Sequence, residues 1–308
     1  MSFDTFIPEL WEAKLDVPYQ GALVYNQPGI ADREYEGTIR EKGDTVSINR
    51  LITGEVKDYK RGVPIESDTL STEDTKLHID AQKYTAFDVE DIDAVQAAGA
   101  FQETALADYG YKMATEADQY SAEKMADGAG TKLGTIKVFD GSDYHVPASG
   151  QTTAWDVVRL IRAEFDKRSI PKENRWMVVG GDFASSLLAD RRITDAAHAG
   201  DNTILLNGEV SARPVLGFRI TVSPNAPVTA GRELIIAGVK GGYNFASQLT
   251  KTEAYRSHEQ FADTFRTLNV WGGAATRKDR LFTISPDVQA GTLPSFGSPV
   301  TEPDDTGA

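Results

Sequence analysis

The sequence predicts an α+β fold, and three features of its pattern support this class. Residues 35–59 alternate in the manner of a polar β-hairpin, and residues 91–126 carry apolar or small residues at helical spacing. Residues 153–239 then mix short helices with short apolar strands, and more strand patterns follow. Runs of strand and runs of helix in such an order are typical of α+β proteins.

The N-terminal 34 residues predict an extended arm, because aromatic residues and prolines occur there with no clean period beyond one short helical turn. The next segment predicts a long hairpin, with strands at 35–39 and 46–50 and a turn at Gly43-Asp44. These strands carry little apolar surface. We therefore expect the hairpin to lean on a neighbour, which need not belong to the same chain.

A strand at 77–90, with a bulge near Gln82, is expected to lead into a long helix. From Asp91 to Ala126 apolar residues recur every three or four positions, which indicates one buried helical face. At 1.5 Å of rise per residue this helix would span roughly 50 Å, the length of a structural beam. Gly128 is expected to end it.

The middle of the chain predicts a compact mixed unit. Thr153 and Asp156 form a start signal for one helix, and Asp182 is the expected cap of a second helix that runs to Leu188. Between them, the apolar run 175–179 predicts a short buried strand. Further strands are expected at 215–222, 234–239, 249–257, 265–271 and 280–284.

Composition excludes several classes of function. Of the 308 residues 40% are hydrophobic, which is enough for a substantial core. The formal charge of -14 argues against a tightly held nucleic acid, because phosphate binding requires clustered Lys and Arg. The absence of cysteine excludes disulfides, cysteine-ligated zinc and thiol nucleophiles. We expect neither a signal peptide nor a membrane span.

Motifs for catalysis or metal binding are weak. The four histidines, His78, His145, His198 and His258, lie far apart and match no zinc pattern. The glycine-rich segment 128–134 follows a helix, whereas a phosphate loop precedes one. Carboxylates are too numerous for a catalytic pair to be singled out. We therefore predict a protein that is not an enzyme and that has no catalytic residues, cofactor or metal site.

Charge is distributed unevenly along the chain. Residues 88–127 hold ten acids against two bases, a net of -8 within the total of -14, whereas residues 33–62 hold seven bases against six acids. The hairpin is thus expected to attract the acidic helix of another copy. The alternative is that both are solvated surfaces, where exposed ion pairs contribute about 0–1 kcal/mol each. The candidate inter-subunit contacts are Arg40, Lys42, Arg50, Lys57, Lys60 and Arg61 on the hairpin and Glu103, Asp108, Glu116, Asp118 and Glu123 on the helix.

Five short phrases occur in order along the chain. They are FIPELW at 6–11, GDTVSI at 43–48, KYTAFDVEDID at 83–93, RWMVVG at 175–180 with LLAD closing the next helix, and FRTLNVWG at 265–272. Over about residues 3 to 285, these phrases and the order of elements resemble the major capsid proteins of tailed bacteriophages with the Hong Kong 97 fold. The specificity lies in the ordered set.

The resemblance implies a viral major capsid protein that self-assembles as hexamers and pentamers into an icosahedral shell around double-stranded DNA, which it contacts without sequence specificity. Its expected partners are other copies of itself, a separate scaffolding protein, a portal and a decoration protein, in a virion assembled in the host cytoplasm. The implied segments are an N-terminal arm at 1–34, an extended loop (β-hairpin) at 35–75, a peripheral domain with the spine helix at 76–146, an axial α/β domain at 147–242, peripheral return strands at 243–285 and a C-terminal tail at 286–308.

Two other functions stay open from the sequence. A bacterial nanocompartment shell, similar to encapsulins, would have the same fold and enclose a cargo enzyme. A soluble acidic hydrolase would instead carry a deep polar pocket in the middle domain. Shell particles in electron micrographs would separate the shell proteins from the hydrolase.

Overall fold

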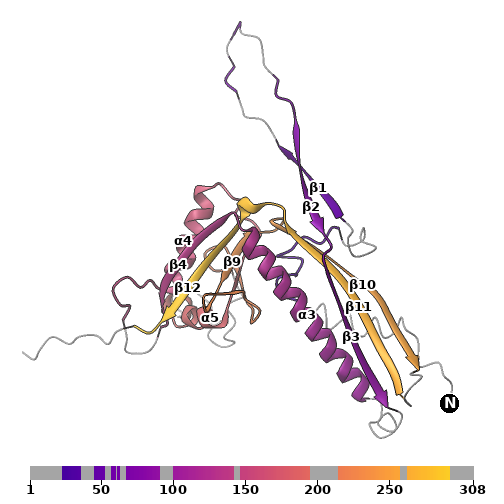
Figure 1. Ribbon diagram of the computed structural model, residues 1–308. Coiled ribbons are helices and arrows are strands. Elements are labelled where there is room, and N and C mark those ends of the chain that lie inside the picture. The colour runs from indigo at the N-terminus through magenta and orange to yellow at the C-terminus, as the bar shows by residue number, and fades with distance from the viewer. Residues whose placement is uncertain are drawn as a thin grey trace, which may run out of the picture.

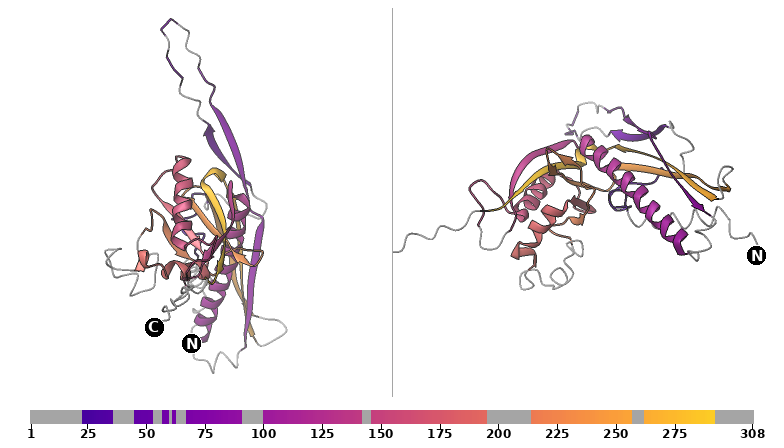
Figure 2. Two further views of the ribbon diagram at one scale, coloured as in Figure 1. Left: turned by 90° about the vertical axis from the view of Figure 1, so that its left-hand side faces the viewer. Right: turned by 60° about the horizontal axis from the view of Figure 1, so that its bottom comes forward.

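The computed structural model shows an elongated molecule in which a five-stranded sheet and a three-stranded sheet form the two ends (Figure 1). Short helices cover the first sheet, and the long helix α3 runs along the second. A two-stranded hairpin projects from the rest, as the left view of Figure 2 also shows. The structure describes residues 23–35, 45–52, 57–59, 61–62, 67–90, 100–141, 146–194, 214–256 and 262–291.

The five-stranded sheet holds the largest apolar core among the described residues. Its edge pairs are parallel and its inner pairs antiparallel, in the order β4-β12-β9-β5-β6. Every residue of the central strands β5 and β9 is buried, as expected for apolar strands that are covered on both faces. The strands are β4 (Thr131–Phe139), β5 (Arg175–Val179), β6 (Arg219–Val222), β9 (Ile235–Val239) and β12 (Leu281–Gln289).

Helix α4 (Ala154–Lys167) covers one face of this sheet and begins as predicted. Thr153 is the N-cap, and its hydroxyl oxygen accepts a hydrogen bond from the backbone N–H of Asp156 at 3.3 Å. Phe165 packs between Phe218 and Phe282, with ring centroids 5.2 and 4.2 Å away. The predicted apolar stripe is buried along its whole length: Ala154, Val157, Val158, Ile161 and Phe165.

The three-stranded sheet is antiparallel, with β11 (Ala262–Ala275) between β10 (Tyr243–Arg256) and β3 (Ala81–Glu90). Alternate residues of each strand face α3. Phe87 of β3, for example, stacks on Phe265 and on Tyr109 of the helix, with ring centroids 5.2 and 5.0 Å away. One face of this sheet is therefore covered by a single helix.

Helix α3 (Ala100–Gly128) has 29 residues and, at about 1.5 Å per residue, a length of about 44 Å. The predicted apolar face is confirmed where it is described, with Met113 and Ala117 buried. The helix ends at Gly128 as predicted, where a Cβ would collide with that of Ala275. The predicted start at Asp91 lies outside the described residues. None of the helices in the described ranges is long and apolar enough to cross a membrane.

The projecting hairpin corrects one prediction. Strand β1 (Thr45–Ile52) pairs with β2 (Ser71–His78), so residues 53–70 connect the two strands of this hairpin, whereas the predicted turn at Gly43-Asp44 lies outside the described residues. The partner strand reads STEDTKLH and has no apolar alternation that could identify it. The predicted strand at 77–90 is accordingly two strands, β2 and β3, which are separated at Ile79-Asp80.

Other boundaries differ for local reasons. The N-cap of α5 (Gly181–Leu188) is Gly180 and not Asp182, which lies in the first turn of the helix. The Glu233 side chain occupies the space that a Cβ on Gly180 would need, so this position requires glycine. The strand expected at 215–222 shortens to β6, because the backbone turns at Leu216 with a positive φ of 50°. The strands β10, β11 and β12 all extend beyond their predicted ranges, and β12 takes in the first residues of the predicted tail. The smaller elements are α6 (Arg191–Thr194), β7 (Val228–Thr229), β8 (Arg232–Glu233) and the 3-10 turn η3 (Lys278–Arg280).

Candidate assembly interface

Three of the six candidate cations on the hairpin fall within the described residues. Arg50 lies 3.7 Å from the carboxylate of Asp279 in η3, and Lys57 lies 2.7 Å from that of Asp68 on the opposite arm of the hairpin. Arg61 is exposed at the distal part of the hairpin. The remaining candidates, Arg40, Lys42 and Lys60, lie outside the described residues.

The candidate acids of α3 have three different surroundings. Asp108 pairs with Lys112 one turn along the helix at 2.6 Å, and Glu116 pairs with Lys83 of β3 at 3.1 Å. Because these pairs are exposed, water and salt screen them strongly. Glu123 makes no such pair within the described chain. The side chain of Glu103 lies outside the described part.

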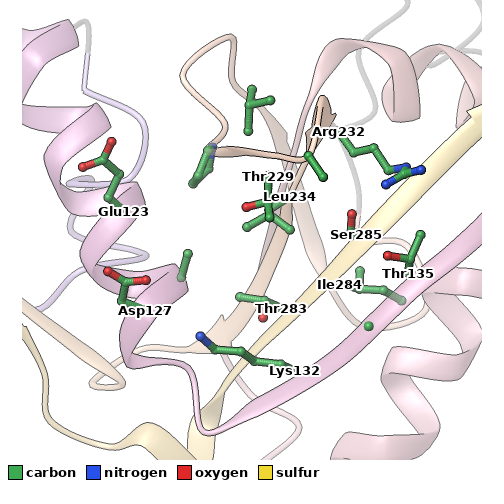
Figure 3. Close-up of a pocket in the computed structure, with 15 residues that line it drawn as sticks. Glu123, Asp127, Lys132, Thr135, Thr229, Arg232, Leu234, Thr283, Ile284 and Ser285 are labelled. Atoms are coloured by element: carbon green, nitrogen blue, oxygen red, sulfur yellow. The ribbon is translucent and has the colours of Figure 1, made fainter.

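Glu123 lines a cavity of about 600 Å³ between α3 and the five-stranded sheet. Figure 3 shows Glu123 and Asp127 on the helix, with Lys132 and Thr283 on the facing strands. The walls come from several segments of the chain and mix charged, hydroxyl and aliphatic side chains. Across the described residues no three His, Cys, Asp or Glu side chains gather closely enough to hold a metal ion.

Asp118 is a correction to the predicted contacts. It is completely buried, and its carboxylate accepts hydrogen bonds from the backbone N–H groups of Val24 at 2.6 Å and Asn26 at 3.4 Å, and from the Asn26 side chain at 3.2 Å. Burial raises its pKa to about 6, although these donors act in the opposite direction. Asp118 therefore anchors the arm segment to α3 within one subunit and is not a contact to another copy.

The distribution of charged residues in the sequence did not reveal the exposed apolar side chains of the hairpin. Its outer half exposes large apolar side chains, although the sequence led us to expect little apolar surface there. Large exposed apolar groups on a thin hairpin are costly in water and are typical of a surface that another molecule covers. The exposed fractions are 54% for Leu51, 46% for Ile52, 75% for Tyr59 and 65% for Leu70.

The three-stranded sheet has a second exposed apolar surface on the face turned away from α3. Phe87 and Lys83 of β3 contact the helix, so Tyr84 between them points to the other face and is 75% exposed. Tyr255 of β10 is also exposed, beside the Arg266 and Glu253 pair. A projecting hairpin and an open sheet face are thus the two candidate contact surfaces.

Comparison with known proteins places this architecture. No family model and no curated protein matches the chain. A solved structure from Mycobacterium phage Che8 is 30% identical and covers 82% of this chain and 88% of its own, with a TM-score of 0.66. The mature capsid of bacteriophage PhiM1 is 15% identical and covers 80% of this chain and 83% of its own, with a TM-score of 0.60. A virus-like particle from Pyrococcus furiosus is 10% identical and covers 90% and 98%, with a TM-score of 0.51.

The long helix beside a three-stranded sheet, the compact five-stranded unit and the projecting hairpin define a structural protein of the capsid class. The similarity to the phage structures identifies the family within the capsid class. The chain belongs to the major capsid proteins of tailed bacteriophages. It is a component of the virion and associates with copies of itself.

Proposed function

We propose that the chain assembles as hexamers and pentamers into an icosahedral shell around double-stranded DNA. The observation that carries this proposal is the hairpin, which projects from the subunit and exposes Leu51, Ile52, Tyr59 and Leu70. A hairpin that reaches one neighbour while the subunit receives the hairpin of another makes a head-to-tail contact. Such contacts close into rings when the rotation between copies allows it.

The receiving surface in this proposal is the open face of the three-stranded sheet. Tyr84 and Tyr255 offer aromatic area there, and apolar contact with the hairpin tip would remove both surfaces from water. The basic residues of the hairpin and the unpaired acids of α3, led by Glu123, would add charge complementarity and set the register between copies. In this proposal we keep the residue ranges that the sequence predicted for the arm, the extended loop, the peripheral domain and the axial domain.

The net negative charge of the chain supports a shell that encloses DNA without binding it tightly. A subunit with a net charge of -14 repels phosphate at long range, so packaged DNA would move freely along the inner wall. The proposed role is structural, with no catalysis by the subunit. A scaffolding protein, a portal and a decoration protein would act as separate chains during assembly in the host cytoplasm.

A nanocompartment shell is the second candidate. The Pyrococcus furiosus particle, which shares the fold at 10% identity, favours this possibility over any enzyme. The two shells differ in content, because one encloses a genome and the other a cargo protein. The soluble acidic hydrolase has less support, because it requires a deep polar pocket within the middle domain. The cavity of about 600 Å³ is lined only in part by residues 147–242, and the rest of its lining comes from segments before and after this range.

Electron microscopy of the protein produced alone and with its neighbouring genes tests the proposal. We expect closed shells whose capsomers have six-fold and five-fold symmetry. Nuclease-protected DNA inside particles from infected cells would support the viral shell, whereas a co-purifying enzyme would support the nanocompartment. Particles no larger than small oligomers under all assembly conditions would contradict both.

A further inference from the structure

A second cavity, of about 530 Å³, lies at the root of the hairpin. Strand β1, the turn before β10 and the turn between β11 and β12 meet there, and each supplies at least one cation. We call the cavity the root pocket. Its basic residues are Arg50, Lys240, Arg277 and Arg280.

The root pocket carries more positive than negative charge in a chain that is otherwise strongly acidic. Its lining holds the four bases named above and two acids, Asp32 and Glu34, which leaves a net of +2 against -14 for the whole chain. Asp279 adds one further carboxylate near Arg50, at 3.7 Å. The root pocket therefore keeps a net positive charge after Asp32, Glu34 and Asp279 are counted.

The cations of the pocket are poorly neutralised within the subunit. The side chains of Lys240, Arg277 and Arg280 make no hydrogen bond or ion pair with any described residue. Burial and the positive charges of Arg277 and Arg50 lower the pKa of Arg280, although the carboxylate of Asp279 acts in the opposite direction. Like charges held this close in a half-enclosed space destabilise the free subunit, and a ligand with negative charge would relieve that cost.

We propose that the root pocket binds carboxylate side chains of an adjacent copy. This inference rests on the proposed assembly and names a polar contact at the root of the hairpin, next to the exposed apolar side chain of Leu51. Guanidinium groups suit this role, because they hold carboxylates in bidentate geometry and stay charged. A second copy is the fitting source, since it is acidic overall and presents carboxylates such as Glu123 and Asp127 that pair with no cation among the described residues.

The position of the pocket favours a neighbouring copy over DNA. Strand β1 lines the pocket and belongs to the hairpin that projects from the subunit (Figure 1), so a copy that covers the paired part of the hairpin lies close to the pocket. DNA would have to approach an acidic subunit to reach three or four cations at a single point. DNA binding at the root pocket would contradict the proposal, and the experiments below are designed to detect it.

A charge-neutralising pair of variants tests the proposal. R277Q/R280Q removes two cations from the pocket, and R159Q/R162Q removes two from α4, where both arginines pair with acids of their own helix. We expect R277Q/R280Q to fold normally and to form about tenfold fewer shells than the wild type, with the largest deficit at low salt. The α4 variant should assemble like the wild type.

Zero-length cross-linking identifies the partner group. A carbodiimide joins a lysine amine to a carboxylate in contact with it, so Lys240 in assembled shells should become linked to an acidic residue of another chain. K240R keeps the positive charge but has no primary amine and should lose this product. Mixed isotopically labelled and unlabelled shells distinguish links between chains from links within one chain.

The outcomes separate this inference from the proposed function. Normal assembly of R277Q/R280Q, together with Lys240 cross-links only within one chain, would overturn the carboxylate contact while leaving the shell intact. Reduced DNA retention with unchanged assembly would assign the pocket to DNA and overturn it as well. Failure of the wild type to form any shell would count against the proposed function itself.

Discussion

The five-stranded end and the three-stranded end of the molecule both have a buried core but differ in the apolar surface that they leave exposed. In the first, one cluster of 21 buried residues joins the sheet to α4 and α5. In the second, a cluster of 18 buried residues joins α3 to β10, β11 and the arm segment, and a smaller cluster of four lies beneath the hairpin, while large apolar side chains of the hairpin and of the open sheet face stay exposed. Both ends therefore have a core of their own, whereas the second also carries the exposed apolar surfaces that other copies cover in the proposed assembly.

Substitution in the first end should cause the largest loss of stability. Phe165 is fully buried and packs against Phe218 and Phe282, so Phe165→Ala leaves a large cavity. We expect the free energy of unfolding to fall by about 3–5 kcal/mol. Urea unfolding of the unassembled subunit, followed by circular dichroism, measures this change.

Leu160 provides the matched control on the same helix, because it is largely exposed. Leu160→Ala should change the unfolding free energy by no more than about 0.5 kcal/mol. Equal losses from the two substitutions would mean that the core of this end does not control its stability, and the contrast between the ends would weaken.

Asp118 should make the second end sensitive to pH. Its pKa lies near 6, above the ordinary value of 3.8, so the folded protein binds this proton more readily than the unfolded chain does. The contribution to stability is therefore present below about pH 4 and is lost as the pH rises through about 6, by about 3 kcal/mol in total. Asp118→Asn should remove this part of the pH dependence.

Denaturation curves at pH 4 and pH 7 measure the effect as a difference between variant and wild type. Tyr25 and Tyr243 lie near Asp118, but both tyrosines have raised pKa values and stay neutral in this range. Glu123→Gln is the control, because it removes an exposed carboxylate from the same helix. Parallel pH profiles for the Asp118→Asn variant and the wild type would contradict the assigned role.

The apolar tip of the hairpin should show the opposite pattern from Phe165. Leu51 and Leu70 are exposed, so L51N/L70N should leave the unfolding free energy within about 0.5 kcal/mol of the wild type. The same variant should assemble about tenfold less efficiently, because apolar area that a neighbour covers is lost. Urea unfolding of the unassembled subunit measures the first result, and sedimentation with electron microscopy measures the second. Unimpaired assembly would show that no copy covers these side chains.

Much of the five-stranded end could be predicted from the sequence, because its signals are local. The cap at Thr153, the stripe of α4 and the strand Arg175–Val179 all follow from residues within a few positions of each other. The pairing of β1 with β2 could not be predicted in this way. It joins polar segments about twenty-five residues apart, and no apolar alternation marks the second one.

The candidate contacts show the same limit. Counting charges located an acidic helix but could not separate Asp118, which is buried, from Glu123, which is exposed. Exposure depends on which face of α3 meets the arm segment, and that is a tertiary property. The small residues around Asp118, namely Ala114, Ala117, Ser121 and Ala122, are the signal that could have indicated close packing there.

The smallest expected effect concerns the charges of the hairpin. Reversing Arg40, Lys42, Arg50 and Lys60 to Glu should leave the subunit folded but impair its assembly, because the hairpin would then repel the acidic surface of the next copy. Exposed pairs contribute about 0–1 kcal/mol each, so the deficit should shrink as salt increases, unlike that of L51N/L70N. Shell yield measured across a salt series distinguishes the two variants. A normal yield at low salt would remove charge attraction from the contact between copies and leave apolar burial as its main source.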